Sequence, residues 1–191
     1  ETYQFTPENC AYLESLDAPL GGTLFDPAFI EYLGNMRFTC DIDAVTEGTI
    51  VFPNEPLVRV TGSILQCQLI ETPLLNAVNF ETLIATKAAR VCLATEGPVA
   101  EFGLRRAQGL GGLWASRASV VGGCASTSNV LAGQLYDIPV SGTHSHAWVM
   151  SFDSELEAFR AFAHEFPNNC VLLIDTYSIE TGIQNAINVG L

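Results

Sequence analysis

The chain has 191 residues and a mass of 20.6 kDa, which suits a single domain or one and a fraction. Its 21 acidic and 8 basic residues leave a net charge of −13, so we exclude nucleic acid and anionic membrane surfaces as partners. Because charged residues make up only 15% of the chain and hydrophobic residues 48%, we expect part of the surface to be an interface, in an obligate oligomer or an incomplete chain.

The first 62 residues favour an α/β sandwich segment. Turn residues punctuate its start, and Pro27 opens a plausible helix over residues 27–33. Three short β-rich runs follow, separated by turn residues, which predicts an antiparallel meander or a small sandwich sheet. The runs cover residues 38–44, 49–52 and 57–60.

The remaining residues, 63–191, predict an opening helical stretch and then four βα units. Residues 64–94 are helical in composition, with one break at Pro73. A short strand, a small-residue loop and a helix then recur, which indicates a parallel sheet with helical crossovers that is too short to close an eight-stranded barrel. A capping box that begins with Ser154 predicts a helix that stops before Pro167. The expected strands are residues 99–102, 120–121, 138–140 and 171–174.

Cysteine usage and hydropathy bear on the cellular compartment. The six cysteines are scattered, with no CxxC pair, so we expect free, buried thiols in a reducing cytosol rather than a disulfide framework. No stretch approaches the ~20 apolar residues that span a bilayer, and the acidic N-terminus lacks the basic start of a signal peptide. We therefore expect a cytoplasmic protein.

Polar residues in the loops after these strands are the first candidates for a functional site, because parallel α/β proteins place ligands at the carboxyl ends of their strands. The first loop carries Arg105 and Arg106, two of only eight basic residues. Arginine forks match phosphate oxygens in bidentate geometry, which points to an anionic ligand. The structural alternative is that one arginine forms an ion pair with Glu101 or Asp175.

The second loop, residues 122–129, begins with two glycines and continues with hydroxyl side chains. Such a backbone can approach a phosphate, but Ser126 or Thr127 can equally be a helix N-cap. No lysine follows the glycines, so the loop is not a P-loop.

The third loop holds His144 and His146. This spacing is common among metal ligands, although a third ligand would have to come from Cys124 or Asp175. Alternatively, a neutral imidazole beside arginines can attack a phosphoryl group, or either ring can be a hydrogen-bonded core histidine. His164 is expected to be an ordinary helix residue.

Three long motifs carry a resemblance to a known family. They are EFGLRRAQG at 101–109, GGCASTSNVLAG at 122–133 and PVSGTHSHAWV at 139–149. On these residues the chain resembles nicotinate phosphoribosyltransferases over nearly its whole length. Shorter segments fit the same family in the same order, at residues 45–48, 52–53, 71–76, 85–90 and 173–177.

The resemblance implies an α/β fold in which residues 1–62 contribute an α+β open sandwich domain. Residues 63–191 would form the incomplete first half of a TIM-like α/β barrel. It also implies a cytoplasmic homodimer that transfers phosphoribosyl from 5-phosphoribosyl 1-diphosphate to nicotinate in NAD biosynthesis. The resemblance further implies that ATP would be hydrolysed through a phosphohistidine, and that ATP and Mg²⁺ would enter as substrate complexes, with no protein metal ligands.

The family motifs also assign residues. His146 matches the histidine that ATP phosphorylates, and Thr143 matches a residue that contacts nicotinate. Arg105 and Arg106 match the arginines of the phosphoribosyl diphosphate site, and Asp175 matches an acid in the pocket. Arginines and Mg²⁺ would stabilise the leaving diphosphate, while the acid stabilises positive charge on the sugar.

Departures from the family pattern limit this expectation. Relatives are about twice as long and open with a Thr-Asp-Leu-Tyr-Gln type segment that is not found before Glu1. We therefore expect about half an active site, and no turnover by this polypeptide alone. The alternatives are a truncated or non-catalytic relative, a sister phosphoribosyltransferase for nicotinamide or quinolinate, and a metal-dependent hydrolase built on His144 and His146.

Overall fold

The computed structural model describes residues 3–190 and divides the chain into two compact units, Glu1–Asn79 and Phe80–Leu191. The division falls inside the long helix α3, Ile64–Cys92. The domain boundary expected between residues 62 and 63 stays a prediction. Residues 1–2 and 191, at the ends of the predicted domains, lie outside the described residues.

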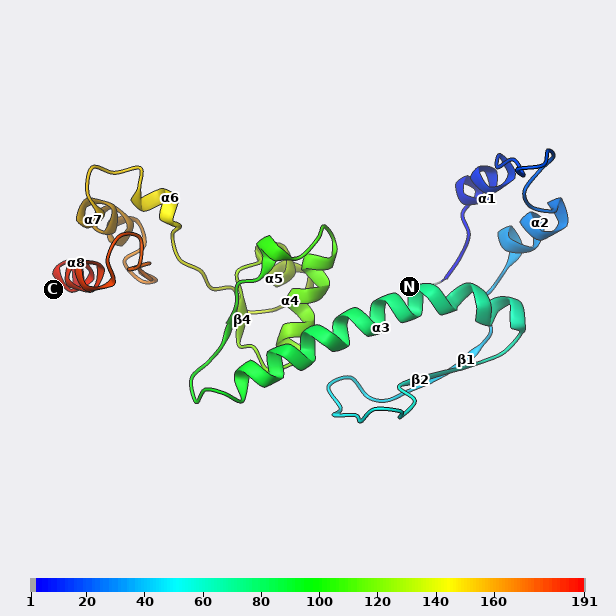
Figure 1. Ribbon diagram of the computed structural model, residues 1–191, viewed down its shortest axis with the longest axis horizontal. Coiled ribbons are helices and arrows are strands. Elements are labelled where there is room, and N and C mark those ends of the chain that lie inside the picture. The colour runs from blue at the N-terminus through cyan, green and yellow to red at the C-terminus, as the bar shows by residue number, and fades with distance from the viewer. Residues whose placement is uncertain (1–2, 191) are drawn as a thin grey trace. The chain divides into compact units, whose positions relative to one another are not determined.

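Two short helices begin the first unit, α1 (Pro7–Glu14) and α2 (Pro27–Asn35), and they pack against each other (Figure 1). Each starts at a proline, whose missing N–H is not needed in a first turn. The Asp26 side chain caps α2 by accepting a hydrogen bond from the backbone N–H of Ala28. The helix expected at residues 27–33 is therefore confirmed.

The sheet of the first unit has two strands, β1 (Asp41–Ala44) and β2 (Val58–Thr61), which pair antiparallel. The third expected strand, residues 49–52, is wrong. The run has no pairing partner among the described residues, and a turn follows it directly: the Phe52 N–H donates to the Glu55 carboxylate, and Asn54 has a φ of 68°. The chain turns back on itself there before it can form a strand.

Helix α3 runs through Pro73 without the expected break. Proline has no N–H, so the carbonyl of Leu69, four residues earlier, loses its helical donor. The Tyr3 hydroxyl donates to this same carbonyl at 2.9 Å. A tertiary hydrogen bond thus replaces the one that proline removes.

In the second unit, strand β3 (Ala100–Glu101) pairs parallel with β4 (Ser126–Thr127). Thr127 also forms a parallel bridge with Val140, so three parallel segments lie side by side. The strand expected at 120–121 is wrong, because those residues end helix α4, Gly111–Val121. Gly123 then turns the chain with a φ of +109°, which glycine adopts at little cost.

No barrel is seen within residues 3–190, and the expected strand at 171–174 is not formed there. The fold of the described chain is mixed α/β, with two two-stranded sheets. Side-chain hydrogen bonds hold segment 171–176 in place of a backbone ladder. The remaining elements are η1 (Leu104–Arg106), α5 (Val130–Tyr136), α6 (His146–Val149), α7 (Glu155–Glu165) and α8 (Ile179–Gly190).

Helices α6, α7 and α8 lie close together at the C-terminal end of the second unit (Figure 1). Val149, Ala158 and Phe159 are fully buried and form a small core among these helices. The Ser154 side chain caps α7 by accepting from the Glu157 N–H at 3.3 Å, which is one half of the expected capping box, and the helix ends before Pro167 as expected.

All six cysteines are free thiols, as expected, but only Cys124 is buried and Cys170 is exposed. The expectation of uniformly buried thiols is therefore wrong. Among the described residues, no helix combines the length and apolar character needed to cross a membrane.

Candidate functional site

His146 lies on the third loop, where α6 begins, and its imidazole faces two side chains from segment 171–176. Its Nδ1 is 3.3 Å from the hydroxyl oxygen of Thr176, and its Nε2 is 3.9 Å from a carboxylate oxygen of Asp175. The side chains of His146 and Asp175 are each 53% exposed. The ring is thus oriented by a carboxylate and a hydroxyl and is open to a ligand from solvent.

His144, two residues earlier, has the opposite environment. It is 8% exposed, and its ring packs edge-on against Phe162 with a centroid distance of 4.9 Å. The Leu173 N–H donates to its Nε2 at 3.1 Å, so Nδ1 carries the proton and faces the Ser145 carbonyl at 3.4 Å. Burial lowers the pKa of His144 below its ordinary value of 6.5. Of the alternatives for this loop, His144 is the hydrogen-bonded core histidine.

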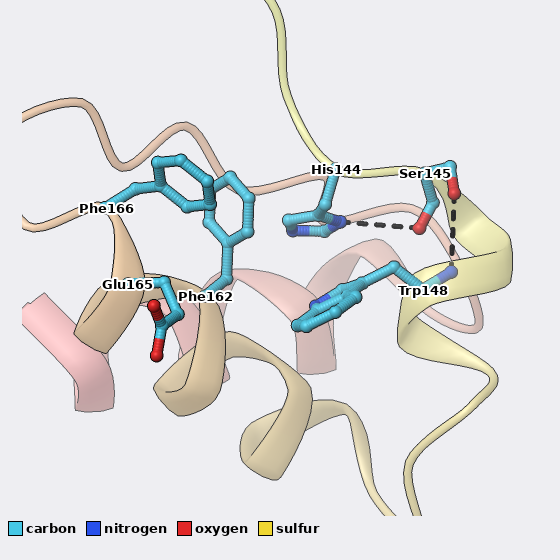
Figure 2. Close-up of a pocket in the computed structure, with 6 residues that line it drawn as sticks. All are labelled: His144, Ser145, Trp148, Phe162, Glu165 and Phe166. Carbon is cyan, nitrogen blue, oxygen red and sulfur yellow. Dashed lines mark hydrogen bonds between the residues drawn. The ribbon is translucent and has the colours of Figure 1, made fainter.

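Figure 2 shows the surroundings of His144, with its imidazole above the Trp148 indole and beside the Phe162 ring. These aromatic side chains line a hollow of about 280 Å³. The Ser145 hydroxyl accepts from the Trp148 N–H and caps α6, which sets the direction in which His146 leaves the loop. His144, a candidate metal ligand of the third loop, lines this hollow, whereas Thr143, His146 and Asp175 do not.

Thr143 is the third member of this loop. Its hydroxyl donates to the carbonyl of Val171. The side chains of residues 143, 144 and 146 therefore all bond segment 171–176, at Val171, Leu173 and Thr176. The structure thus brings together two of the predicted site residues, His146 and Asp175, while Thr143 bonds the same segment four residues before Asp175.

The arginine pair lies on η1, directly after β3, and both side chains are exposed. Within residues 3–190 neither arginine forms an ion pair, with Asp175 or with any other acid. The Glu101 carboxylate, an expected partner, instead accepts from the Thr127 hydroxyl at 2.7 Å and from the Gly103 N–H. The ion-pair alternative for the first loop is wrong as far as the described residues extend.

The hydroxyls of the second loop are engaged in structural bonds. Ser126 shares a 2.7 Å hydrogen bond with Ser141, and Thr127 is completely buried. Neither is a helix N-cap. Asn129 caps α5 instead, by accepting from the Ala132 N–H at 3.2 Å.

Sequence reasoning missed Thr176 and Glu101 as members of these sites. Thr176 had a detectable signal, because it directly follows Asp175 at the end of an apolar run. Glu101 was considered only as an arginine partner, and no local pattern links it to a threonine 26 positions away. Among the described residues, no group of three or more His, Cys, Asp or Glu side chains is arranged to hold a metal ion.

Comparisons with known proteins agree on one family. A family model for the N-terminal domain of nicotinate phosphoribosyltransferase matches residues 1–79. A nicotinate phosphoribosyltransferase of Bacillus subtilis is 45% identical over 193 residues, covering 100% of this chain and 38% of that protein. Nicotinate phosphoribosyltransferase pncB2 of Mycobacterium tuberculosis is 41% identical over 192 residues, covering 100% of this chain and 40% of that protein.

Solved structures show the same relationship. The crystal structure of human nicotinic acid phosphoribosyltransferase superposes with a TM-score of 0.84 at 35% identity, covering 97% of this chain and 47% of that one. A nicotinate-nucleotide pyrophosphorylase from Pyrococcus furiosus has a TM-score of 0.60 at 24% identity, which indicates a shared fold alone. It covers 79% of this chain and 39% of that one. The chain thus spans about 40% of the curated relatives it matches.

Proposed function

Because this chain belongs to the nicotinate phosphoribosyltransferase family, we propose that it forms part of an enzyme that transfers phosphoribosyl from 5-phosphoribosyl 1-diphosphate to nicotinate. The products are nicotinate mononucleotide and diphosphate, in NAD biosynthesis, with ATP hydrolysed through a phosphohistidine. The chain covers only part of its relatives, so the activity of a whole enzyme is itself part of the proposal.

The observation that carries this proposal is the exposed His146 imidazole between Asp175 and Thr176. A ring nitrogen of His146 attacks the γ-phosphorus of ATP, and the bond from phosphorus to the bridging oxygen breaks to release ADP. The ring gives up its proton as the nitrogen–phosphorus bond forms. Asp175, 3.9 Å from Nε2, stabilises the positive charge that develops on the imidazole.

We assign the phosphoribosyl diphosphate to Arg105 and Arg106, because both guanidinium groups are exposed and without an ion-pair partner among the described residues. Bidentate hydrogen bonds from them would stabilise the charge on the leaving diphosphate. Mg²⁺ enters bound to ATP and to the diphosphate, as part of each substrate. Thr143 would contact nicotinate once its hydroxyl turns from the Val171 carbonyl.

The expected α/β barrel belongs to the same proposal. We propose that the three parallel segments at β3, β4 and Val140 begin an α/β barrel. The TM-score of 0.84 with the human enzyme supports this. We also propose a cytoplasmic homodimer, since large apolar side chains such as Ile50 and Leu93 are more than 80% exposed and suit an interface.

Phosphate transfer from ATP tests the proposal. The full 191-residue chain is incubated with Mg²⁺ and ATP labelled at the γ-phosphate, and the protein is then analysed for acid-labile phosphate by peptide mass spectrometry. We expect the label on His146 and its loss in the His146→Asn variant. His164→Gln, which alters an exposed histidine on α7, is the matched control and should retain the label.

Three outcomes have distinct meanings. Label on His146 supports the proposed enzymatic function. Absence of label, even when the C-terminal part of a relative is added, refutes it and favours a non-catalytic relative. Formation of nicotinate mononucleotide by the 191-residue chain alone would overturn our expectation that this chain has no turnover.

A further inference from the structure

We propose that His144 is a positioning residue for His146 and Asp175, acting as a neutral imidazole that fastens segment 171–176 to the third loop. The two segments share no backbone hydrogen bond among the described residues. Side chains make the connection instead. The importance of the connection for catalysis rests on the function proposed for His146, whereas the connection itself does not.

His144 provides the central bond of three. Thr143 bonds the Val171 carbonyl and His146 faces the Thr176 hydroxyl, and between them His144 accepts from the Leu173 N–H. Both outer side chains are near solvent, where water competes for their partners. The acceptor at Leu173 is the buried His144 ring and the bond is partly buried, so water competes less for it than for the two exposed bonds.

The orientation of the His144 ring is determined from two directions. Phe159 and Phe162 of α7 pack against the ring, at centroid distances of 5.6 and 4.9 Å. The Ser145 carbonyl lies 3.4 Å from Nδ1, which keeps the proton there and leaves Nε2 free to accept. A ring fixed in this way gives the Leu173 N–H one well-defined acceptor.

Asp175 is two residues beyond Leu173 and Thr176 is three. Without the bond at Leu173, segment 171–176 is free to move away from the loop, and the 3.9 Å separation between His146 and Asp175 is no longer maintained. The titratable groups that act on His144 are His146 from its own loop and Glu155 from α7, and Glu165 of α7 lines the hollow beside the ring. Protonation of Nε2 would turn it into a donor that faces the Leu173 N–H, which is also a donor, and the same bond would break.

Amide exchange of Leu173 tests the proposal directly, by NMR on the full chain with rates expressed as protection factors. His144→Phe preserves the aromatic packing but removes the acceptor, and we expect the protection factor of Leu173 to fall about tenfold. His144→Gln keeps an acceptor that does not titrate. It should retain the protection and hold it constant between about pH 7.5 and 5.5, while the wild-type value falls over that range.

A Leu173 protection factor in His144→Phe within about twofold of wild type would overturn the proposal. If that variant does not fold, the pH comparison decides. A Leu173 protection factor that stays constant between about pH 7.5 and 5.5 in the wild type as well as in His144→Gln also overturns the proposal. Phosphate labelling of His146 then separates the two proposals. Wild-type protein that stays unlabelled even when the C-terminal part of a relative is added refutes the proposed function only, whereas slower labelling in His144→Phe together with lost Leu173 protection supports both.

Discussion

Replacing Gly182 with alanine tests the packing that positions Asp175. Gly182 is buried in α8, and a Cβ built on it would lie 2.0 Å from the carbonyl oxygen of Ile174. Alanine is otherwise the better residue for a helix interior, by roughly 0.5–1 kcal/mol. The substitution therefore sets a local gain against a tertiary clash, and the sign of the change in stability reveals which effect is larger.

The magnitude follows from the contact distance. Ordinary contact with a Cβ begins at 3.4 Å, so α8 and segment 171–176 must separate by about 1.4 Å. Overpacking of this kind costs about 1–3 kcal/mol against a helix gain of about 0.5–1 kcal/mol, and the 2.0 Å approach to a backbone oxygen favours the upper part of the cost range, so we expect a net destabilisation of about 1–2.5 kcal/mol. Asp175 follows Ile174 directly, so the same displacement would carry its carboxylate out of ion-pair distance of His146.

Urea unfolding followed by tryptophan fluorescence measures the change in the free energy of unfolding. Gly190→Ala is the matched control, because Gly190 lies in the same helix and a Cβ added there would meet nothing within 4 Å. We expect Gly182→Ala to be destabilised and Gly190→Ala to be unchanged or slightly more stable. If Gly182→Ala is as stable as the wild type or the control, the packing argument is refuted.

Three further predictions concern other parts of the chain. Burial lowers the pKa of His144, so below pH 6.5 the unfolded chain binds more protons than the folded chain and the free energy of unfolding should fall. His144→Gln should remove this part of the pH dependence, which urea titrations at about pH 7.5 and 5.5 would measure. Tyr3→Phe should lower the free energy of unfolding by about 1 kcal/mol in the wild-type protein, but by little in a Pro73→Ala background, where alanine supplies the missing helical donor. A double-mutant cycle that gives no coupling energy between the two positions would contradict this. The sulfur atoms of Cys40 and Cys67 are 4.0 Å apart, so oxidised glutathione should convert this pair to a disulfide while two glutathione thiols are released; peptide mass spectrometry that detects only mixed disulfides at the two positions would count against it.

The local elements were predictable because their signals are short-range. Helix α2 starts at a proline that follows an aspartate, and a serine caps the start of α7. Helix α7 ends shortly before Pro167. The motifs around residues 101–149 likewise pointed to a family that the comparisons support. The chemical roles of His146 and the arginine pair stay predictions.

Strands were predicted less well, because a strand exists only where another chain segment pairs with it. Residues 120–121 are apolar and β-branched, yet they continue helix α4. Residues 171–174 are equally suited to a strand, but side chains rather than a backbone ladder satisfy part of their hydrogen bonding. Pro73 was expected to break the helix, but α3 continues through it, and the distant Tyr3 hydroxyl bonds the Leu69 carbonyl that proline leaves without a donor.

The third loop shows most clearly what the sequence determines and what the tertiary structure decides. The sequence by itself determined that two histidines with the same chemistry stand two residues apart beside a small-residue turn. The tertiary structure alone decided which one is buried, because Phe159 and Phe162 come from α7 and the Leu173 N–H from a segment 29 positions away. Burial and a donor at Nε2 make His144 a structural residue, whereas exposure beside Asp175 leaves His146 available for chemistry.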